Sequence, residues 1–400
     1  MKRPLRVLVL ARLYPNAVTP ATGLWIERPT RLLASSCELK VVAAVPFCPP
    51  LPLPRIRANR EYRDIPAYEN RGGVAIIHPR FVPHPSRHLL GVERRSYTHA
   101  AMATVTRLRR TFPFDLVHAH FTYPEGVVAA MIGRRHGVPY MITEHAPWKP
   151  WFDDPRFRKH AVPAARGAGA ITAVSAWARE TMRLYLPEKT HVRIVPEGVD
   201  PELFPLEEAP RSKQVVYAGA LRTLKAVDVL LRAMRLVIGR EPRATLVLAG
   251  ADFRDETRPL KALAAELGLD EQARFVGLLP PDELARLMGQ SAVLVLPSRQ
   301  ETFGAVLVES LACGTPVVAT RPGGPEDIVT DDVGRLVQKD DPEALADAIL
   351  GVLAHPEAYE PRALRSYAVE RFSWNRIAED MYGIYEEILG GSSGKTPMHR

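Results

Sequence analysis

Short apolar runs alternate with segments of helical periodicity along most of the chain. Arg6 to Leu10 and Thr245 to Ala249 are such runs, whereas Val227 to Ile238 repeats apolar residues at helical spacing. Continuous apolar runs of this length predict strands that are buried on both faces, as in parallel sheets. Because strands and helices alternate in this way twice over, we expect an α/β protein with two doubly wound parallel sheets.

The same pattern predicts where the individual elements lie. In the first half of the chain we expect strands at Arg6–Leu10, Leu39–Val45, Val74–His78, Leu116–His120, Tyr140–Thr143 and Ala170–Val174. Helices are expected among them at Trp25–Ala34, Glu93–Arg110, Tyr123–His136 and Ala176–Tyr185. In the second half we expect strands at Val215–Ala218, Thr245–Ala249, Ala273–Val276, Ala292–Leu296 and Thr315–Ala319, with helices that include Val227–Ile238 and Thr257–Leu267.

The length of 400 residues is too great for one ordinary core and suits two or three domains. The link between the two halves is expected near Val195–Pro201. We therefore predict an N-terminal domain over residues 1–195 and a C-terminal domain over residues 196–371. A closing helix over residues 372–389 and a Gly/Ser-rich, disordered tail over residues 390–400 complete the prediction.

The stretch from Pro297 to Gly324 carries the most chemical information. It joins two predicted buried strands, so it must contain a crossover helix. Gly314 marks the end of this helix. Glu301 lies at the turn from strand to helix, and Glu309 follows eight residues later inside the helix. The backbone N–H groups around Thr302 to Ala305 would point out of the carboxyl edge of the sheet, where phosphates bind.

A carboxylate beside an anion site is unfavourable unless it has hydrogen-bond donors of its own. Sugar hydroxyls would supply such donors to Glu301, and the hydroxyls of a ribose would supply them to Glu309. The alternative is that both glutamates are solvated charges near a helix end, where the helix dipole favours them.

The stretch from Glu301 to Glu309 resembles the Glu-x7-Glu signature of family 4 of the retaining glycosyltransferases, and the resemblance extends from Arg6 to about Leu389. It implies the GT-B architecture, in which two Rossmann-like domains face each other across a cleft. In that architecture the N-terminal domain binds the acceptor, the C-terminal domain binds a nucleotide sugar, and a C-terminal helix crosses back to the N-terminal domain. The implied reaction moves a sugar from a nucleoside diphosphate donor with retention of anomeric configuration.

The resemblance also assigns residues to the donor. Glu301 would hold the sugar and Glu309 the ribose, while the helix start at Thr302, Phe303 and Gly304 would face the diphosphate. The family pattern Gly-Arg-x4-Lys carries over to Gly219 and Lys225, which implies that Lys225 binds the diphosphate. Ala220 stands at the usual arginine position, and whether Arg222 supplies the missing charge or is an exposed residue at a helix start stays open.

Candidates in the N-terminal half come from strand ends and from one loop. His145 ends a predicted strand and matches the family histidine that hydrogen-bonds the donor sugar near the reacting carbon, although a histidine at a strand end often has a structural role. His120 is expected on the same face of the sheet as His118 and is the better candidate for the cleft. A role in the core or in supporting other site residues remains the alternative for His120. Gly23 closes a loop that resembles the family loop over donor phosphate and acceptor, or forms an ordinary turn.

Aromatic residues follow His145. Trp148 is a candidate for acceptor contact, together with Trp151 and Phe152, because such rings stack on sugars or contact lipid. Packing in a proline-containing loop is the alternative for the same side chains.

The charge of the chain is unevenly distributed. Residues 1–110 contain 19 Lys and Arg against 6 Asp and Glu, a balance of +13, whereas the remainder contains 34 against 39, a balance of −5. A basic N-terminal half suits an anionic membrane surface or a polyanionic acceptor, or it is simply a solvated surface. Nucleic acid is disfavoured as a partner because no helix-turn-helix, zinc or aromatic-platform motif accompanies the arginines.

The remaining features concern compartment and cofactors. The three cysteines are scattered, which favours a reducing cytosol, and no apolar run approaches the roughly 20 residues that span a bilayer. We expect a cytoplasmic protein, peripheral on the inner face of the membrane. No Asp-x-Asp element stands out, so we expect catalysis without a metal or a cofactor, and the resemblance implies that the departing diphosphate helps to deprotonate the acceptor.

The expected product is a glycan or a lipid-linked sugar of envelope or extracellular polysaccharide biosynthesis, formed by transfer of a hexose-type sugar. Two alternatives remain open at this point. One is a GT-B enzyme of different chemistry, such as a nucleotide-sugar epimerase or a phosphorylase. The other is a non-catalytic, basic protein that binds membranes or polyanions. The base and sugar of the donor, and the acceptor, are not determined by the sequence.

Overall fold

A computed structural model describes residues 3–47, 60–83, 90–207, 212–252 and 255–390. The chain divides into two compact units. Unit 1 comprises Met1–Val174, Ala178–Val195 and Ile377–Arg400, and unit 2 comprises Ser175–Trp177 and Pro196–Arg376. Most of the proline-rich run after Phe47, the basic residues Arg55, Arg57 and Arg87, and the tail over 391–400 lie outside the described residues.

Unit 1 is built on a sheet of eight described strands in the order β10-β9-β8-β7-β1-β2-β5-β4. Neighbouring strands are parallel except for β4, which pairs antiparallel with β5. The strands are β1 (Arg6–Leu10), β2 (Glu38–Val42), β4 (Tyr68–Arg71), β5 (Val74–Ile77), β7 (Leu116–His120), β8 (Tyr140–Glu144), β9 (Ala170–Ala173) and β10 (Val192–Ile194). A separate ribbon pairs β3 (Val45–Pro46) with β6 (Arg80–Phe81).

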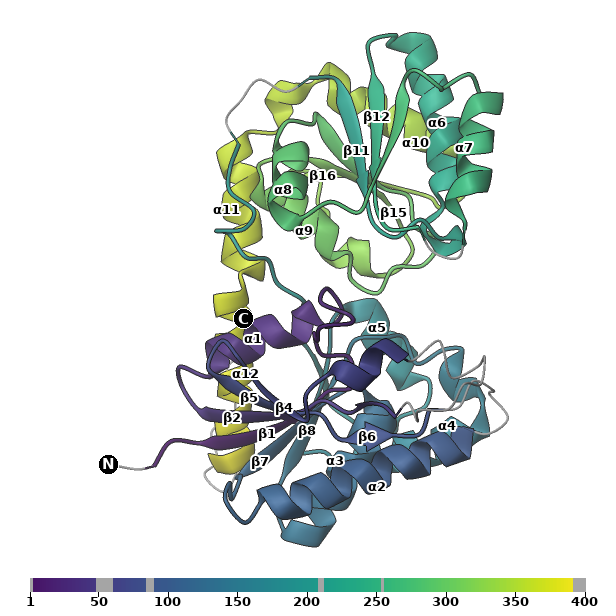
Figure 1. Ribbon diagram of the computed structural model, residues 1–400. Coiled ribbons are helices and arrows are strands. Elements are labelled where there is room, and N and C mark those ends of the chain that lie inside the picture. Colours follow the sequence, from purple (N-terminus) through teal and green to yellow (C-terminus); the bar gives the residue numbers. More distant parts are fainter. Residues whose placement is uncertain (1–2, 48–59, 84–89, 208–211, 253–254, 391–400) are drawn as a thin grey trace. The chain divides into compact units, whose positions relative to one another are not determined.

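Helices flank this sheet on both sides (Figure 1). They are α1 (Leu24–Leu33), α2 (Leu90–Leu108), α3 (Val127–His136), α4 (Pro155–Arg166), α5 (Ala176–Arg183) and α12 (Trp374–Gly390), with short turns η3 (Thr122–Gly126) and η4 (Trp151–Asp153). Helix α12 starts in unit 2 and belongs to unit 1 from Ile377 onward. Within the described residues, no helix combines the length and apolar content that a bilayer span requires.

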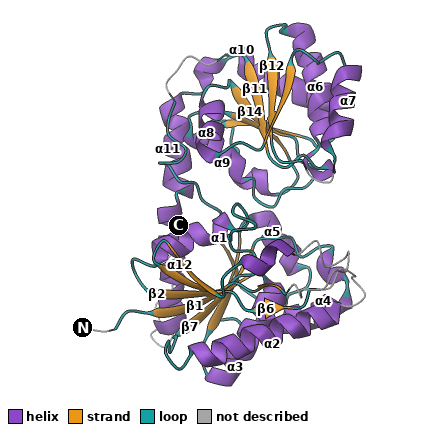
Figure 2. Ribbon diagram, viewed as in Figure 1, coloured by secondary structure: helices purple, strands orange, loops and turns teal. Residues whose placement is uncertain are grey.

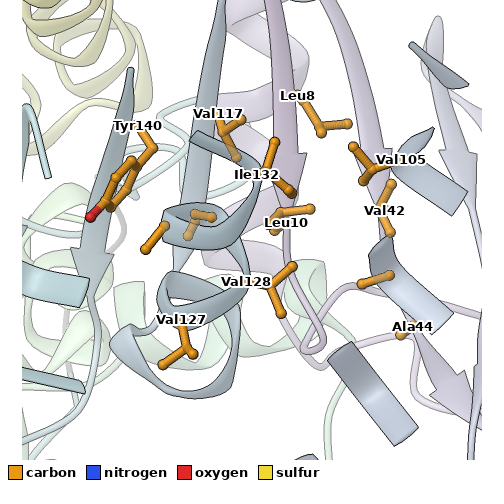
Figure 3. Packing of buried hydrophobic residues seen from close by; sticks show 14 of the residues in the cluster. Leu8, Leu10, Val42, Ala44, Val105, Val117, Val127, Val128, Ile132 and Tyr140 are labelled. Carbon is orange, nitrogen blue, oxygen red and sulfur yellow. The ribbon is translucent and has the colours of Figure 1, made fainter. Parts of the chain in front are cut away.

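The core of unit 1 lies between the sheet and the helices α2 and α3. Leu8, Leu10 and Val117 of the strands pack with Val105 of α2 and Ile132 of α3 (Figure 3). Burying an aliphatic side chain of this size contributes roughly 1.5–3 kcal/mol. Because side chains alternate along a strand, His118 and His120 of β7 point to the opposite face of the sheet, away from this core.

Unit 2 is built on a wholly parallel sheet in the order β13-β12-β11-β14-β15-β16, with helices on both sides (Figure 2). The strands are β11 (Gln214–Ala218), β12 (Thr245–Ala249), β13 (Ala273–Gly277), β14 (Val293–Leu296), β15 (Val317–Thr320) and β16 (Gly334–Val337). The helices are α6 (Val227–Arg240), α7 (Thr257–Glu266), α8 (Pro281–Gly289), α9 (Ala305–Ala312), α10 (Pro342–Ala354) and α11 (Pro361–Phe372). Short turns are η5 (Thr223–Lys225), η6 (Gly324–Asp327) and η7 (Pro356–Ala358).

The predicted α/β class with two doubly wound sheets is confirmed. In each unit the first strand, β1 or β11, lies between the second strand and a strand that follows later in the chain. The strand order therefore reverses between β1 and β7 and between β11 and β14, and the carboxyl ends at such a reversal form the usual ligand crevice of open α/β sheets.

The predicted helix Tyr123–His136 is wrong at its start. Tyr123 has an extended backbone (φ −135°, ψ 127°), and the regular helix begins at Val127. The reason is local, since the residue before a proline is disfavoured in the helical region and Pro124 follows Tyr123. Elements with weak apolar patterns, such as α4 and the antiparallel edge strand β4, were not predicted.

The close approach of two loops in unit 2 requires a glycine at position 250. A Cβ atom there would lie 1.8 Å from the carbonyl oxygen of Gly219, whereas a Cβ at Gly239 in α6 meets nothing within 4 Å. We expect Gly250→Ala to lower the free energy of unfolding by about 3 kcal/mol, because backbone must move. Gly239→Ala should raise it by roughly 0.5–1 kcal/mol. Urea unfolding followed by fluorescence measures both, and equal stabilities of the two variants would contradict the packing described.

Candidate functional site

The strand-order reversal of unit 2 brings the segment after β11 beside the segment after β14. Lys225 ends the turn η5 that follows β11, and Glu301 follows β14. The Lys225 ammonium forms an ion pair with Glu301 Oε2, and the Ser298 hydroxyl lies 3.4 Å from the same oxygen. Both side chains are largely buried, with 24% of Lys225 and 13% of Glu301 exposed. The structure thus joins two of the predicted donor residues.

Arg299 holds this arrangement and was not singled out from the sequence. Its guanidinium pairs with Asp228 at 2.8 Å and with Asp340 at 2.6 Å. It also donates to the carbonyl of Thr223, and its backbone N–H donates to the carbonyl of Leu224. The hydrogen bond to Asp228 is the main cause that raises the pKa of Arg299 above its ordinary range. Arg299 therefore connects the turn that bears Lys225 to the strand end that precedes Glu301.

The segment from Glu301 to the following helix is fixed by glycines. Gly304 adopts a left-handed conformation (φ 101°) and caps α9, in which Glu309 lies half-buried. The backbone N–H of Gly324 donates to the Glu301 carbonyl at 2.9 Å, and a Cβ at Gly324 would lie 2.5 Å from the backbone of Phe303. The backbone on either side of Thr302 is therefore held rigidly.

The predicted start of the crossover helix at Thr302 to Gly304 lies too early for Phe303. The helix begins at Ala305, and Phe303 precedes both it and its capping residue Gly304. Its ring packs in the core against Phe372, at 5.9 Å between ring centroids, with 2% of the residue exposed. Any role of Phe303 toward a ligand therefore belongs to its backbone.

The segment after β11 contains two further predicted donor residues, Gly219 and Arg222. Gly219 has φ 150°, and its N–H donates to the carbonyl of Ala249 at 3.0 Å. Arg222 is exposed and extended, and it directly precedes η5. The carboxylate of Glu256 accepts hydrogen bonds from the backbone and the hydroxyl of Thr223, which orders the turn next to Arg222.

In unit 1 the neighbouring carboxyl ends of β7 and β8, next to the reversal between β1 and β7, bring histidines together. His120 ends β7 and is buried, and its Nδ1 is hydrogen-bonded to Nε2 of the half-buried His145 at 2.9 Å. The two rings are stacked, with centroids 5.2 Å apart. The expectation that His120 shares a face with His118 is met, since those rings lie 4.2 Å apart.

His118 extends this stack into the core of the unit. Its Nδ1 is hydrogen-bonded to the Tyr385 hydroxyl of α12 at 2.7 Å, and its Nε2 to the Thr143 hydroxyl at 2.8 Å. Burial lowers the pKa of His118 to about 3 and lowers the pKa of His120 well below its ordinary value. Both rings are therefore neutral near neutral pH, so each has one donor and one acceptor nitrogen.

Two family models match consecutive segments of the chain. The family model described as Glycosyltransferase Family 4 matches residues 42–203, and the model described as Glycosyl transferases group 1 matches residues 200–371. A D-inositol 3-phosphate glycosyltransferase from Saccharomonospora viridis is 35% identical, over 70% of this chain and 72% of the relative. The chain belongs to glycosyltransferase family 4.

Solved structures agree with this assignment at the level of the fold. Sucrose-phosphate synthase from Thermosynechococcus elongatus has a TM-score of 0.80 at 20% identity, over 97% of this chain and 100% of that chain. HepE from Anabaena, in complex with UDP-glucose, has a TM-score of 0.71 at 19% identity, over 96% of this chain and 100% of the HepE chain. The family 4 glycosyltransferase described here has the GT-B fold.

Glu144 anchors the loop that carries His145 in this family 4 glycosyltransferase. The buried carboxylate accepts hydrogen bonds from the backbone N–H groups of Thr122, His145 and Ala146, from the hydroxyl of Thr122 and from the indole of Trp148. Trp148 is itself buried, with 1% exposed. The sequence showed Glu144 only as a neighbour of the candidate histidine, and the fold alone reveals its five hydrogen bonds.

Gly23 lies where a side chain does not fit. It has φ 84° at the start of α1, and a Cβ would lie 2.1 Å from the carbonyl oxygen of Leu13. Two residues later, the ring of Trp25 lies 6.4 Å from that of His145. The loop that Gly23 closes therefore brings the start of α1 to the histidine pair, and Trp25 joins the candidate residues.

The hydrogen bond from α12 to the histidine stack can be tested by Tyr385→Phe. The change leaves a buried ring nitrogen of His118 without its hydroxyl partner, so the free energy of unfolding should fall by roughly 1–3 kcal/mol. Tyr382→Phe on the same helix is the control, because its hydroxyl makes no hydrogen bond to a described residue, and it should change stability by less than about 0.5 kcal/mol. Equal urea midpoints for the two variants would show that the bond contributes nothing.

Proposed function

We propose that the protein is a retaining, metal-independent glycosyltransferase that moves a hexose-type sugar from a nucleoside diphosphate sugar to a glycan or lipid-linked acceptor. The observation that carries the proposal is the pairing of Lys225 with Glu301 at the strand-order reversal of unit 2. A cation and a carboxylate at such a crevice suit a ligand with both a diphosphate and sugar hydroxyls.

In this proposal the ligand separates the ion pair of Lys225 and Glu301, and each of the two side chains binds a different part of the ligand. The diphosphate binds the Lys225 ammonium and the backbone at Thr302 to Gly304, while Glu301 accepts hydrogen bonds from the sugar and Glu309 from the ribose. Stabilising the negative charge that develops on the departing diphosphate accelerates the reaction, because that charge is greater in the transition state than in the bound donor. UDP-glucose in the HepE complex supports a nucleoside diphosphate sugar as the donor class.

The proposal assigns unit 1 to the acceptor and assigns His145 a hydrogen bond to the transferred sugar. A neutral His120 beside it fixes which His145 nitrogen is available to a ligand. We also propose that the reaction takes place on the cytoplasmic face of a membrane, in envelope or extracellular polysaccharide synthesis, because of the basic balance of residues 1–110. If the protein does not bind vesicles of anionic lipid at low salt, the proposed location at the membrane is wrong.

Thermal unfolding with nucleoside diphosphates and their sugars tests the donor site. A donor at 100 times its dissociation constant should stabilise the protein by about 2.7 kcal/mol. Lys225→Ala and Glu309→Ala should each lose most of this shift. Lys213→Ala is the matched control, since Lys213 pairs with Glu241 outside the site and its variant should keep the shift. Unchanged shifts in both site variants would refute the assignment.

The chemistry is tested separately from binding. With the donor found by the thermal screen, the product should have the anomeric configuration of the donor, and activity should persist in excess EDTA. Lys225→Ala should lower kcat by roughly 100-fold or more, as expected for loss of a group that stabilises transition-state charge. Proton NMR of the product reports the configuration, and an inverted product or full inhibition by EDTA would overturn the corresponding part of the proposal.

A further inference from the structure

Unit 1 contains a cavity of about 390 Å³ that the donor residues do not account for. It lies beyond the carboxyl ends of β1, β7 and β8, between α2 and the start of α4. Its size falls within the roughly 300–1,000 Å³ of small-molecule sites. Half of its fourteen lining residues are aromatic: Tyr97, Phe121, Tyr123, Trp148, Trp151, Phe152 and Phe157.

The cavity adjoins His145, the residue of unit 1 that the proposed function assigns to the transferred sugar. Glu144 and Ala146, which line it, flank His145 in the chain, and the ring of Phe121 lies 5.2 Å from the ring of His145. Phe121 has φ 75°, a conformation that side chains other than glycine rarely adopt. Hydrogen bonds from its N–H to Thr143 and from Gly126 to its carbonyl hold it there. The strained backbone keeps the Phe121 ring in the lining of the cavity, beside His145.

The charges around the cavity balance. Arg12 and Arg94 stand against Glu93 and Glu144, and Arg12 pairs with Glu93 at 3.1 Å. The Glu144 carboxylate is satisfied by the hydrogen bonds described above, and the buried Glu125 lies 3.9 Å from Arg12. A phosphorylated ligand would therefore add negative charge to a site whose described lining residues carry no cationic excess, at a cost in desolvation.

We propose that this cavity binds the apolar part of an uncharged acceptor, an alkyl chain or an aromatic ring attached next to the hydroxyl that receives the sugar. The role of that hydroxyl rests on the proposed function. Rigid aromatic walls favour such a group, with roughly a fourfold gain in affinity for each methylene removed from water. The acceptor class then differs from the charged, polyhydroxylated compound in the name of the Saccharomonospora viridis relative.

Binding of methyl, octyl and phenyl glucosides to the full chain tests this inference. Calorimetry below micelle concentrations should show octyl glucoside, phenyl glucoside or both binding at least tenfold more tightly than methyl glucoside. A preference for octyl glucoside identifies an alkyl chain as the bound group, and a preference for phenyl glucoside identifies an aromatic ring. Equal binding of all three, or tighter binding of glucose 6-phosphate than of any of them, would overturn the proposal.

Cavity variants connect the preference to this site. Trp151→Ala and Phe157→Ala should each reduce the preference for the hydrophobic glucosides at least fivefold. Trp151 is half exposed, so its replacement leaves the core intact. Tyr68→Ala is the control, because Tyr68 is an exposed aromatic of β4 that does not line the cavity. An undiminished preference in both cavity variants would refute the site.

The measurement needs no donor, so the two proposals fail independently. If glucosides bind as expected while nucleoside diphosphates do not, the proposed function is wrong and the cavity assignment stands. If nucleoside diphosphates bind but the hydrophobic preference is missing, only the cavity assignment is wrong.

Discussion

The candidate residues of both units depend on one constraint, the reversal of strand order in a parallel sheet. All the carboxyl ends of parallel strands lie at one edge, and crossover helices leave that edge in opposite directions on either side of the reversal. Between β11 and β14 this leaves room for Lys225 and Glu301, which are far apart in the sequence. In unit 1 the carboxyl ends of β7 and β8, next to the reversal, bring the histidine pair together, and the aromatic cavity lies beyond the ends of β1, β7 and β8.

The charged and titratable side chains differ between the strand-order reversals of the two units. In unit 2 the ion pair of Lys225 and Glu301 remains partly exposed, so an anionic ligand with hydroxyl groups can compete for both partners. In unit 1 burial holds His118 and His120 neutral, and the carboxylate of Glu144 accepts hydrogen bonds from backbone, hydroxyl and indole donors. The proposed charged donor of unit 2 and the proposed uncharged acceptor of unit 1 rest on the same physical reasoning.

Much of the fold and part of the site could be predicted because their signals are local. The buried strands appear as apolar runs, and Glu301, Glu309 and Lys225 stand at spacings that resemble family 4 of the glycosyltransferases. The helix starts at Val127 and Ala305 were predicted wrongly, since Pro124 and the left-handed Gly304 oppose the periodic pattern. Arg299, Glu144 and Trp25 were missed because their partners lie at distant positions in the chain.

The sequence by itself determined the α/β class, the family and the residue types available to a nucleotide sugar. Only the tertiary structure decided which of these residues meet, that Lys225 pairs with Glu301, that His120 pairs with His145, and that seven aromatic side chains enclose a cavity. The physical reason is that apolar periodicity acts within one element, whereas ion pairs and cavities form where strand order brings the ends of separate elements together.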